Sequence, residues 1–188
     1  MRKVRLWTIR SKKKFKSDKK WGFVFNSVLR VNAHFATPYH WLSKQMRKRI
    51  GPPTRRVIAT PVWAWMEKPD IRRERHQCRP VTQVRIEFEM PRDQILISDF
   101  DKWHMPLNTS YAGRDYCRFW KELEEKKLYQ IPHEQKPWKY RLKIEKSWEN
   151  IFKVARGGTR QVTMWEIPLE NIIEVTEFKG CSKAKFSS

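Results

Sequence analysis

The stretch VRIEFEM, residues 84–90, alternates strictly between apolar and charged side chains. Successive side chains of a β-strand face opposite ways, so the four apolar residues from Val84 to Met90 would share one face and Arg85, Glu87 and Glu89 the other. A helix, with its period of 3.6 residues, would mix the two sets. We therefore expect a strand here, in a sheet with one face on a core.

Shorter strand patterns flank this stretch, and helical patterns separate them. Strands are predicted at residues 4–9, 61–66, 95–98, 161–167 and 172–178, and helices at residues 37–50, 115–128 and 147–155. Strands near both ends with helices between them indicate an α+β fold. We expect a single domain over residues 1–180 with a mixed or mostly antiparallel sheet and about three helices. Residues 181–188 would form a C-terminal tail.

Two of the predicted helices have recognisable ends. Thr37 can cap the first of them, Pro38 suits its first turn, and Gly51 and two prolines stop it. Its apolar residues repeat every four positions and predict a buried stripe, which leaves the basic residues exposed. Ser147 is predicted to cap the last helix.

Positive charge is concentrated in the first part of the chain. Residues 1–79 contain 22 Lys and Arg against 4 Asp and Glu, a net charge of +18, whereas residues 80–188 contain 19 against 16, a net charge of +3. Such a density of like charge opposes a compact state, so we expect a partner that neutralises it. The basic segments are accompanied by no apolar run of about 18 residues and no amphipathic surface helix, which favours nucleic acid over a membrane.

The basic start of the chain is not followed by the apolar stretch of a signal peptide, so we expect a cytoplasmic protein. Cys78, Cys117 and Cys181 form no CxxC pair and are expected to be free thiols. The chain has no phosphate-binding glycine motif and no closely spaced histidine pair, so we expect no cofactor and no metal.

The lysine-rich run SKKKFKSDKKWGF, residues 11–23, follows the first predicted strand directly. Trp21 and Phe23 would anchor its far end, so residues 11–20 are predicted to form a basic loop rather than a free tail. In a eukaryotic cell the same cluster would serve as a nuclear localisation signal.

Four basic clusters in the first half of the chain predict a nucleic-acid-binding surface whose affinity depends on salt. Trp21 is the tryptophan expected to be exposed and to stack on unpaired bases. Flexible basic segments suit structured RNA, such as ribosomal RNA or another ribonucleoprotein, so RNA is favoured over DNA. The expected contact residues are Lys12, Lys13, Lys14, Lys16, Lys19, Lys20, Trp21, Lys44, Arg47, Lys48, Arg49, Arg55, Arg56, Arg72, Arg73 and Arg75.

The segment SDFDKWH, residues 98–104, is the best candidate for a reacting site. If the preceding strand continues, Asp99 and Asp101 point to the same side, and His104 could complete a metal or acid/base cluster. The alternative, which we favour, is a turn in which the aspartates cap backbone N–H groups and Trp103 packs inward.

Several strings along the chain resemble an uncharacterised family of bacterial and phage proteins that is catalogued as a domain of unknown function. They are RLWTI, RIGPP, PVWAW, KPDIRR, VRIEFEMP, LISDFDKWHMPLN, KSWENIF and QVTMWEIP. The resemblance covers nearly the whole chain and implies a bacterial or phage origin. One expectation from that origin is the role of a phage factor that acts on host machinery. It implies no activity. Family members tend to have Gln in place of Arg10 and a helix of mixed charge after it, so the lysine run is a departure.

An enzymatic alternative stays open. An early strand, an aromatic-rich middle and a Glu on a late strand are similar to the arrangement in ADP-ribosyltransferases, which would make Glu166 the catalytic acid and Arg10 or His40 a dinucleotide-binding residue. Their defining motifs are absent from this chain. The leading hypothesis is therefore binding without catalysis, and the alternative is a nucleotide-dependent transferase or another enzyme that acts on nucleic acid.

Overall fold

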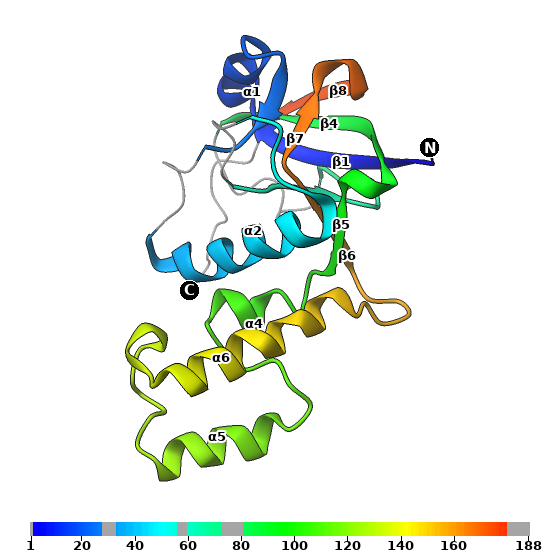
Figure 1. Ribbon diagram of the computed structural model, residues 1–188. Helices are drawn as coiled ribbons and strands as arrows, with labels where there is room; N and C mark the ends of the chain where they lie inside the picture. The colour runs from blue at the N-terminus through cyan, green and yellow to red at the C-terminus, as the bar shows by residue number, and fades with distance from the viewer. Residues whose placement is uncertain (1, 28–32, 56–59, 73–80, 180–188) are drawn as a thin grey trace, which may run out of the picture. The chain divides into compact units, whose positions relative to one another are not determined.

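The computed structural model describes residues 2–27, 33–55, 60–72 and 81–179 (Figure 1). It confirms the predicted α+β class, with a mostly antiparallel six-stranded sheet, a second sheet of two strands, and five α-helices among the described residues rather than about three. The predicted tail at 181–188 lies outside the described residues.

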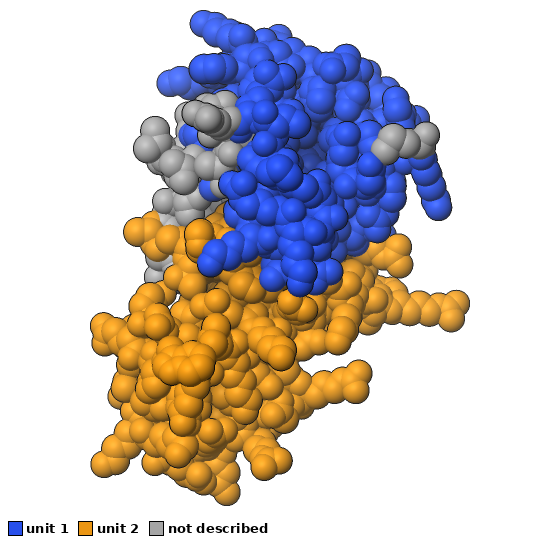
Figure 2. Space-filling view, viewed as in Figure 1, with its two compact units in different colours: residues 1–31, 43–97, 161–188 blue, residues 32–42, 98–160 orange. Residues whose placement is uncertain are grey.

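The chain forms two compact units, which are coloured separately in Figure 2. Unit 1 contains residues 1–31, 43–97 and 161–188, and unit 2 contains residues 32–42 and 98–160. Unit 1 holds most of the sheet structure, and unit 2 is mainly helical.

The large sheet is built around the alternating stretch at residues 84–90. This stretch lies in β4 (Thr82–Pro91), which pairs antiparallel with β1 (Lys3–Ser11) along the whole length of β1, with Leu6 opposite Phe88. The strand order is β5-β6-β3-β1-β4-β8. The other four strands are β3 (Val62–Trp65), β5 (Leu96–Asp99), β6 (Arg160–Met164) and β8 (Ile172–Lys179).

The core of unit 1 lies against one face of this sheet. The four apolar side chains predicted to share a face, from Val84 to Met90, are all buried in it. Leu6, Val62, Val162 and Phe15 join them. The alternation of the sequence therefore identified the core face correctly, because burial on one side imposes a period of two.

The late strand expected at residues 161–167 is two strands. β6 ends at Met164 and stays in the large sheet, whereas β7 (Glu166–Pro168) pairs with β2 (Phe23–Phe25) in the small one. Trp165 lies between them, is buried, and donates its Nε1 hydrogen to the Gly51 carbonyl oxygen at 2.8 Å. The alternation of polar and apolar residues breaks at the adjacent Met164 and Trp165, where the chain changes sheet.

Helix α2 (Ala36–Ile50) contributes residues to both units. It begins one residue before the predicted cap, after a short 3₁₀ turn, and ends at Ile50 as expected. Gly51 follows with a φ of +82°, the left-handed conformation that ends helices. Leu42 and Met46 of the predicted stripe are fully buried.

Unit 2 contains α4 (His104–Leu107), α5 (Tyr116–Glu125) and α6 (Trp138–Ser147). The prediction of an α-helix that starts at Ser147 is wrong, because α6 ends at this residue and residues 148–152 form a 3₁₀ helix. The Ser147 hydroxyl donates back to the Ile144 carbonyl oxygen at 2.6 Å and accepts from the Ala112 N–H at 2.8 Å, so it does not cap the turn ahead of it. Trp148 and Ile151 are fully buried nonetheless.

Candidate nucleic-acid interface

The lysine run is a helix, not the predicted loop. Helix α1 (Lys12–Lys19) starts where β1 ends, and the Ser11 hydroxyl caps it by accepting the Lys14 N–H at 3.2 Å. Phe15 and Asp18, three residues apart, lie on the same side of the helix and are buried. Capping and this inward side give the run a helical structure that its charge alone would not predict.

Asp18 is the one acidic residue of α1, and its side chain is fully buried. Its Oδ2 atom accepts a hydrogen bond from Arg10 Nη1 at 2.6 Å, and Oδ1 is paired with Lys14. Arg10, whose side chain is 8% exposed, also donates to the Phe25 carbonyl oxygen at 3.0 Å and to Asn26 Oδ1 at 2.8 Å. A buried carboxylate with two cationic partners thus fixes α1 to β1 and to the strand that follows.

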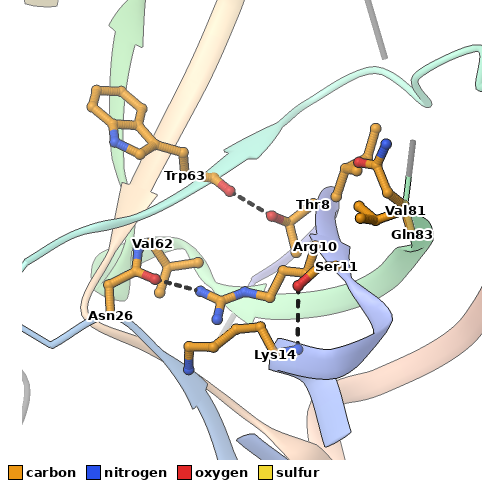
Figure 3. A pocket seen from close by; sticks show the side chains of 10 residues that line it. Thr8, Arg10, Ser11, Lys14, Asn26, Val62, Trp63, Val81 and Gln83 are labelled. Carbon is orange, nitrogen blue, oxygen red and sulfur yellow. Dashed lines mark hydrogen bonds between the residues drawn. The ribbon is translucent and has the colours of Figure 1, made fainter. Parts of the chain in front are cut away.

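A polar pocket of about 440 Å³ lies beside this network. Figure 3 shows the side chains of Arg10 and Lys14 extending next to each other toward Asn26. On another wall, the Thr8 hydroxyl donates to the Trp63 carbonyl oxygen at 2.8 Å. The described lining contains these two cations and no carboxylate, but both cations are already bound to Asp18, which lies outside the lining.

The six lysines of the run separate into two groups. Lys14 faces Asp18, and Lys12 Nζ lies 2.6 Å from Glu177 Oε2 on β8. The other four are exposed and form no ion pair with any residue that the structure describes; they are Lys13, Lys16, Lys19 and Lys20. Lys20 is the C-terminal cap of α1 and is counted with the helix from here on.

An aromatic row continues from α1. Trp21 is 57% exposed, as predicted, and meets Phe25 edge-on with 5.9 Å between ring centroids. Phe25 contacts Phe23 at 5.0 Å, and the guanidinium of Arg55 lies 4.4 Å from the centroid of the Phe23 ring. Trp21 directly follows Lys20, and the buried rings of Phe25 and Phe23 link it to Arg55. We call the four exposed lysines of α1, together with Trp21 and Arg55, the basic surface.

A second group of cations lies at the end of α2, within unit 1. Lys44, Arg47, Lys48 and Arg49 are exposed, as predicted from the helical spacing. The Arg47 guanidinium lies over the Trp165 ring at 5.6 Å, and Arg49 Nε donates to Gln45 Oε1 at 3.3 Å. Trp165 directly precedes Glu166, which pairs with Arg55, so this group is connected to the basic surface through β7.

Of the other arginines predicted to contact nucleic acid, the structure describes Arg72. Arg72 is exposed, and its guanidinium binds Asp70 through Nε at 2.9 Å and Nη2 at 3.0 Å. This hydrogen bond and the adjacent charge raise the pKa of Arg72. A carboxylate thus already holds this guanidinium. Arg56, Arg73 and Arg75 lie outside the described residues.

The residues of the transferase alternative do not form a reacting group in unit 1. Glu166 is bound on both oxygens, by the Thr54 hydroxyl at 2.7 Å and by Arg55 Nε at 3.3 Å. Arg10 belongs to the Asp18 network, and His40 lies in the part of α2 that belongs to unit 2. These contacts give Glu166 the geometry of a carboxylate that positions Arg55.

The SDFDKWH segment has the geometry of a turn. β5 ends at Asp99, so Asp101 is not on the same strand face; it lies in the turn and is exposed. Asp99 Oδ1 accepts from the N–H groups of Asp101 and Lys102, each at 3.1 Å. Trp103 is buried, and the exposed His104 ring bonds to the Asp101 carbonyl oxygen at 3.1 Å. No group of three or more His, Cys, Asp or Glu side chains within the described ranges could hold a metal ion.

The contact of Arg10 with Asp18 and Asn26 was not predicted from the sequence. A signal was present, because Phe15 and Asp18 are spaced as neighbours on a helix, and Ser11 precedes the run in the position of a cap. The partners on Phe25 and Asn26 come from outside the run and could not be predicted from its pattern. Of the predicted free thiols, Cys117 is free and exposed, and the other two cysteines lie outside the described residues.

The fold and this surface define an α+β domain that carries a basic helix on its central strand. The chain belongs to the family described as Domain of unknown function (DUF3841), whose model matches residues 3–173. No curated protein and no solved structure matches the chain. In the described part of the chain, none of the helices has the length and apolar character needed to span a bilayer.

Proposed function

We propose that this protein binds nucleic acid through the basic surface, with structured RNA as the preferred class, and that it does so without catalysis. The observation that carries the proposal is the orientation of α1. Its single carboxylate is buried, whereas Lys13, Lys16, Lys19 and Lys20 are exposed without an ionic partner among the described residues. Such a helix face attracts a polyanion, because each phosphate that it neutralises releases counterions.

The position of Trp21 supports RNA rather than duplex DNA. An exposed indole next to lysines can stack on an unpaired base while the lysines neutralise the adjoining phosphates. Unpaired bases are most accessible in the loops and bulges of folded RNA, including ribosomal RNA.

The proposal is tested by measuring binding against salt. Fluorescence anisotropy with a labelled RNA stem-loop, the same sequence as DNA, and a DNA duplex would be recorded between about 50 and 200 mM salt. We expect affinity to fall steeply with salt for all three and to be highest for the stem-loop. Replacing the four exposed lysines of α1 by Gln should reduce the slope of log affinity against log salt by up to about 3.6, at roughly 0.7 to 0.9 per lost phosphate contact.

A control variant with the same change of net charge makes the test specific to the surface. Lys121, Lys126, Lys139 and Lys146 of unit 2 are exposed and can be changed to Gln together. If the basic surface is the interface, this control retains most of the salt slope. Equal loss in both variants would mean that net charge alone drives binding, and salt-independent binding by the unmodified protein would overturn the proposal.

A further inference from the structure

Unit 2 contains a pocket of about 490 Å³ that none of the preceding observations uses. Its volume lies within the range of about 300 to 1,000 Å³ that is usual for small-molecule sites. The lining combines apolar and aromatic side chains, Met105, Tyr111 and Tyr116, with three cations, Lys102, Arg114 and Lys153. The described lining contains no carboxylate.

One wall of the pocket is held in place by hydrogen bonds to its backbone. Trp148 Nε1 donates to the Ser110 carbonyl oxygen at 2.7 Å, and the Ala112 N–H donates to the Ser147 hydroxyl at 2.8 Å. Asn150 Nδ2 completes the set by donating to the Ala112 carbonyl oxygen at 3.1 Å. Because the buried Trp148 anchors this segment, the wall is formed before any ligand arrives.

Tyr111 forms the centre of this wall. Its ring is buried against Phe119, with 4.2 Å between centroids, and its hydroxyl donates to Asp115 Oδ1 at 2.6 Å. Burial and this hydrogen bond raise the pKa of Tyr111 to about 12, so the wall is uncharged at neutral pH. A Cβ atom on Gly113 would lie 2.3 Å from the Tyr111 ring, so the approach of the ring requires glycine there.

Two of the three cations of the lining, Arg114 and Lys153, have no carboxylate partner in the described part of the chain, whereas Lys102 has one. Lys102 Nζ donates to the Lys153 carbonyl oxygen and lies 3.6 Å from Asp99 Oδ2. Arg114 and Lys153 are exposed, and neither forms an ion pair with a residue in the described ranges. Arg114 in particular presents a planar guanidinium, which can bind a phosphate through two hydrogen bonds.

We propose that this pocket binds a nucleotide, with the base against Tyr116 and Met105 and the phosphate at Arg114 and Lys153. An aromatic anion fits the lining better than a purely apolar or a purely ionic ligand does, because both kinds of contact are present in one cavity. The nucleotide is either a free mononucleotide or an unpaired nucleotide of a nucleic-acid strand. The site belongs to unit 2, so it does not depend on the basic surface of α1.

Isothermal titration calorimetry on the full chain tests the proposal with AMP, GMP, CMP and UMP, and with adenosine and inorganic phosphate as separate ligands. We expect at least one mononucleotide to bind more tightly than both adenosine and phosphate. The double variant Arg114→Gln, Lys153→Gln should weaken that binding at least about tenfold, the effect expected for a lost charge-assisted hydrogen bond. The matched control Arg118→Gln, Lys121→Gln removes two exposed cations of α5 and should leave binding unchanged.

A trinucleotide titrated in parallel distinguishes the two sources. Tighter binding of the trinucleotide assigns the site to a strand, and tighter binding of the mononucleotide assigns it to a free ligand. The variant that lacks the four exposed lysines of α1 should bind the mononucleotide normally, which separates this site from the basic surface. Failure of all four mononucleotides to bind, or equal binding by the double variant, would overturn the inference whether or not RNA binds to α1.

Discussion

Helices α1 and α6 are both rich in cations, yet they differ in where their carboxylates lie. In α1 the only acidic residue, Asp18, is buried beneath the helix. In α6 the carboxylates are beside the cations: Lys143 Nζ lies 3.7 Å from Glu122 Oε2 of α5, and Glu145 belongs to the helix itself. The two helices therefore differ in the position of the neutralising carboxylates and not in their richness in lysine. If α1 binds a polyanion as proposed, that position would distinguish it from α6.

The largest expected difference between the two helices is the loss of stability caused by a substitution at Asp18. Changing Asp18 to Asn keeps the shape but leaves Arg10 buried without its anionic partner, so the free energy of unfolding should fall by about 3 to 5 kcal/mol. Urea denaturation measures this loss. The exposed pair of Lys12 with Glu177 provides the control, since Glu177→Gln should cost less than about 1 kcal/mol. A loss at Asp18 no greater than that of the control would mean that the buried network does not hold α1 in place.

A smaller effect, on RNA affinity alone, is expected from Trp21, and a second exposed tryptophan, Trp138, provides the control. Trp21 follows α1 and is 57% exposed, and Trp138 begins α6 and is 65% exposed. Trp21→Ala should weaken binding of a looped RNA by about 1 to 3 kcal/mol with little change in the salt slope, because it removes a stacking contact. Trp138→Ala should have no such effect. The comparison fails if the two variants lose equal affinity, and a lowered melting temperature for Trp21→Ala would identify that residue as a structural anchor.

The smallest expected effect is the pH dependence of the Tyr111–Asp115 contact in unit 2. The pKa of Tyr111 is raised to about 12 in the folded chain, so the contact stabilises the fold fully below the ordinary tyrosine pKa of about 10 and is lost as the pH rises toward 12. The hydrogen bond from Tyr111 also lowers the pKa of Asp115, so its share is lost in acid as Asp115 protonates. Melting temperatures of the unmodified protein and of Tyr111→Phe should therefore converge at both extremes. A difference that is independent of pH would assign the effect to packing.

The sequence predicted the parts of the fold that depend on local periodicity. The alternation in β4 gave both the strand and its buried face, and Gly51 marked the end of α2. The wrong predictions lie where contacts with residues elsewhere in the structure decide the conformation instead of the local sequence pattern. Ser147 has the residue type of a helix cap, but its hydroxyl is engaged by Ile144 and Ala112.

The candidate site was predictable in composition but not in geometry. The basic clusters and the exposure of Trp21 follow from the sequence, since charged runs stay in water. The inward rotation of Lys14 and Asp18 depends on Arg10, on Phe25 and on Asn26, which no local rule brings together. The pocket of unit 2 that we propose as a nucleotide site is assembled from three separate segments and has no sequence motif.

Ser11 is both the last residue of β1 and the cap of α1, so no linker separates the central strand from the basic helix. The backbone that carries the lysines is consequently helical without a ligand, so the proposed binding would not have to bear the entropic cost of folding a flexible segment. The same junction locks the helix in phase with the sheet. One residue inserted after Ser11 would turn every lysine by about 100° around the helix axis and point some of them at the core. The exposed residues of this surface can therefore be substituted without moving the helix, whereas an insertion or deletion at the junction would displace all of them.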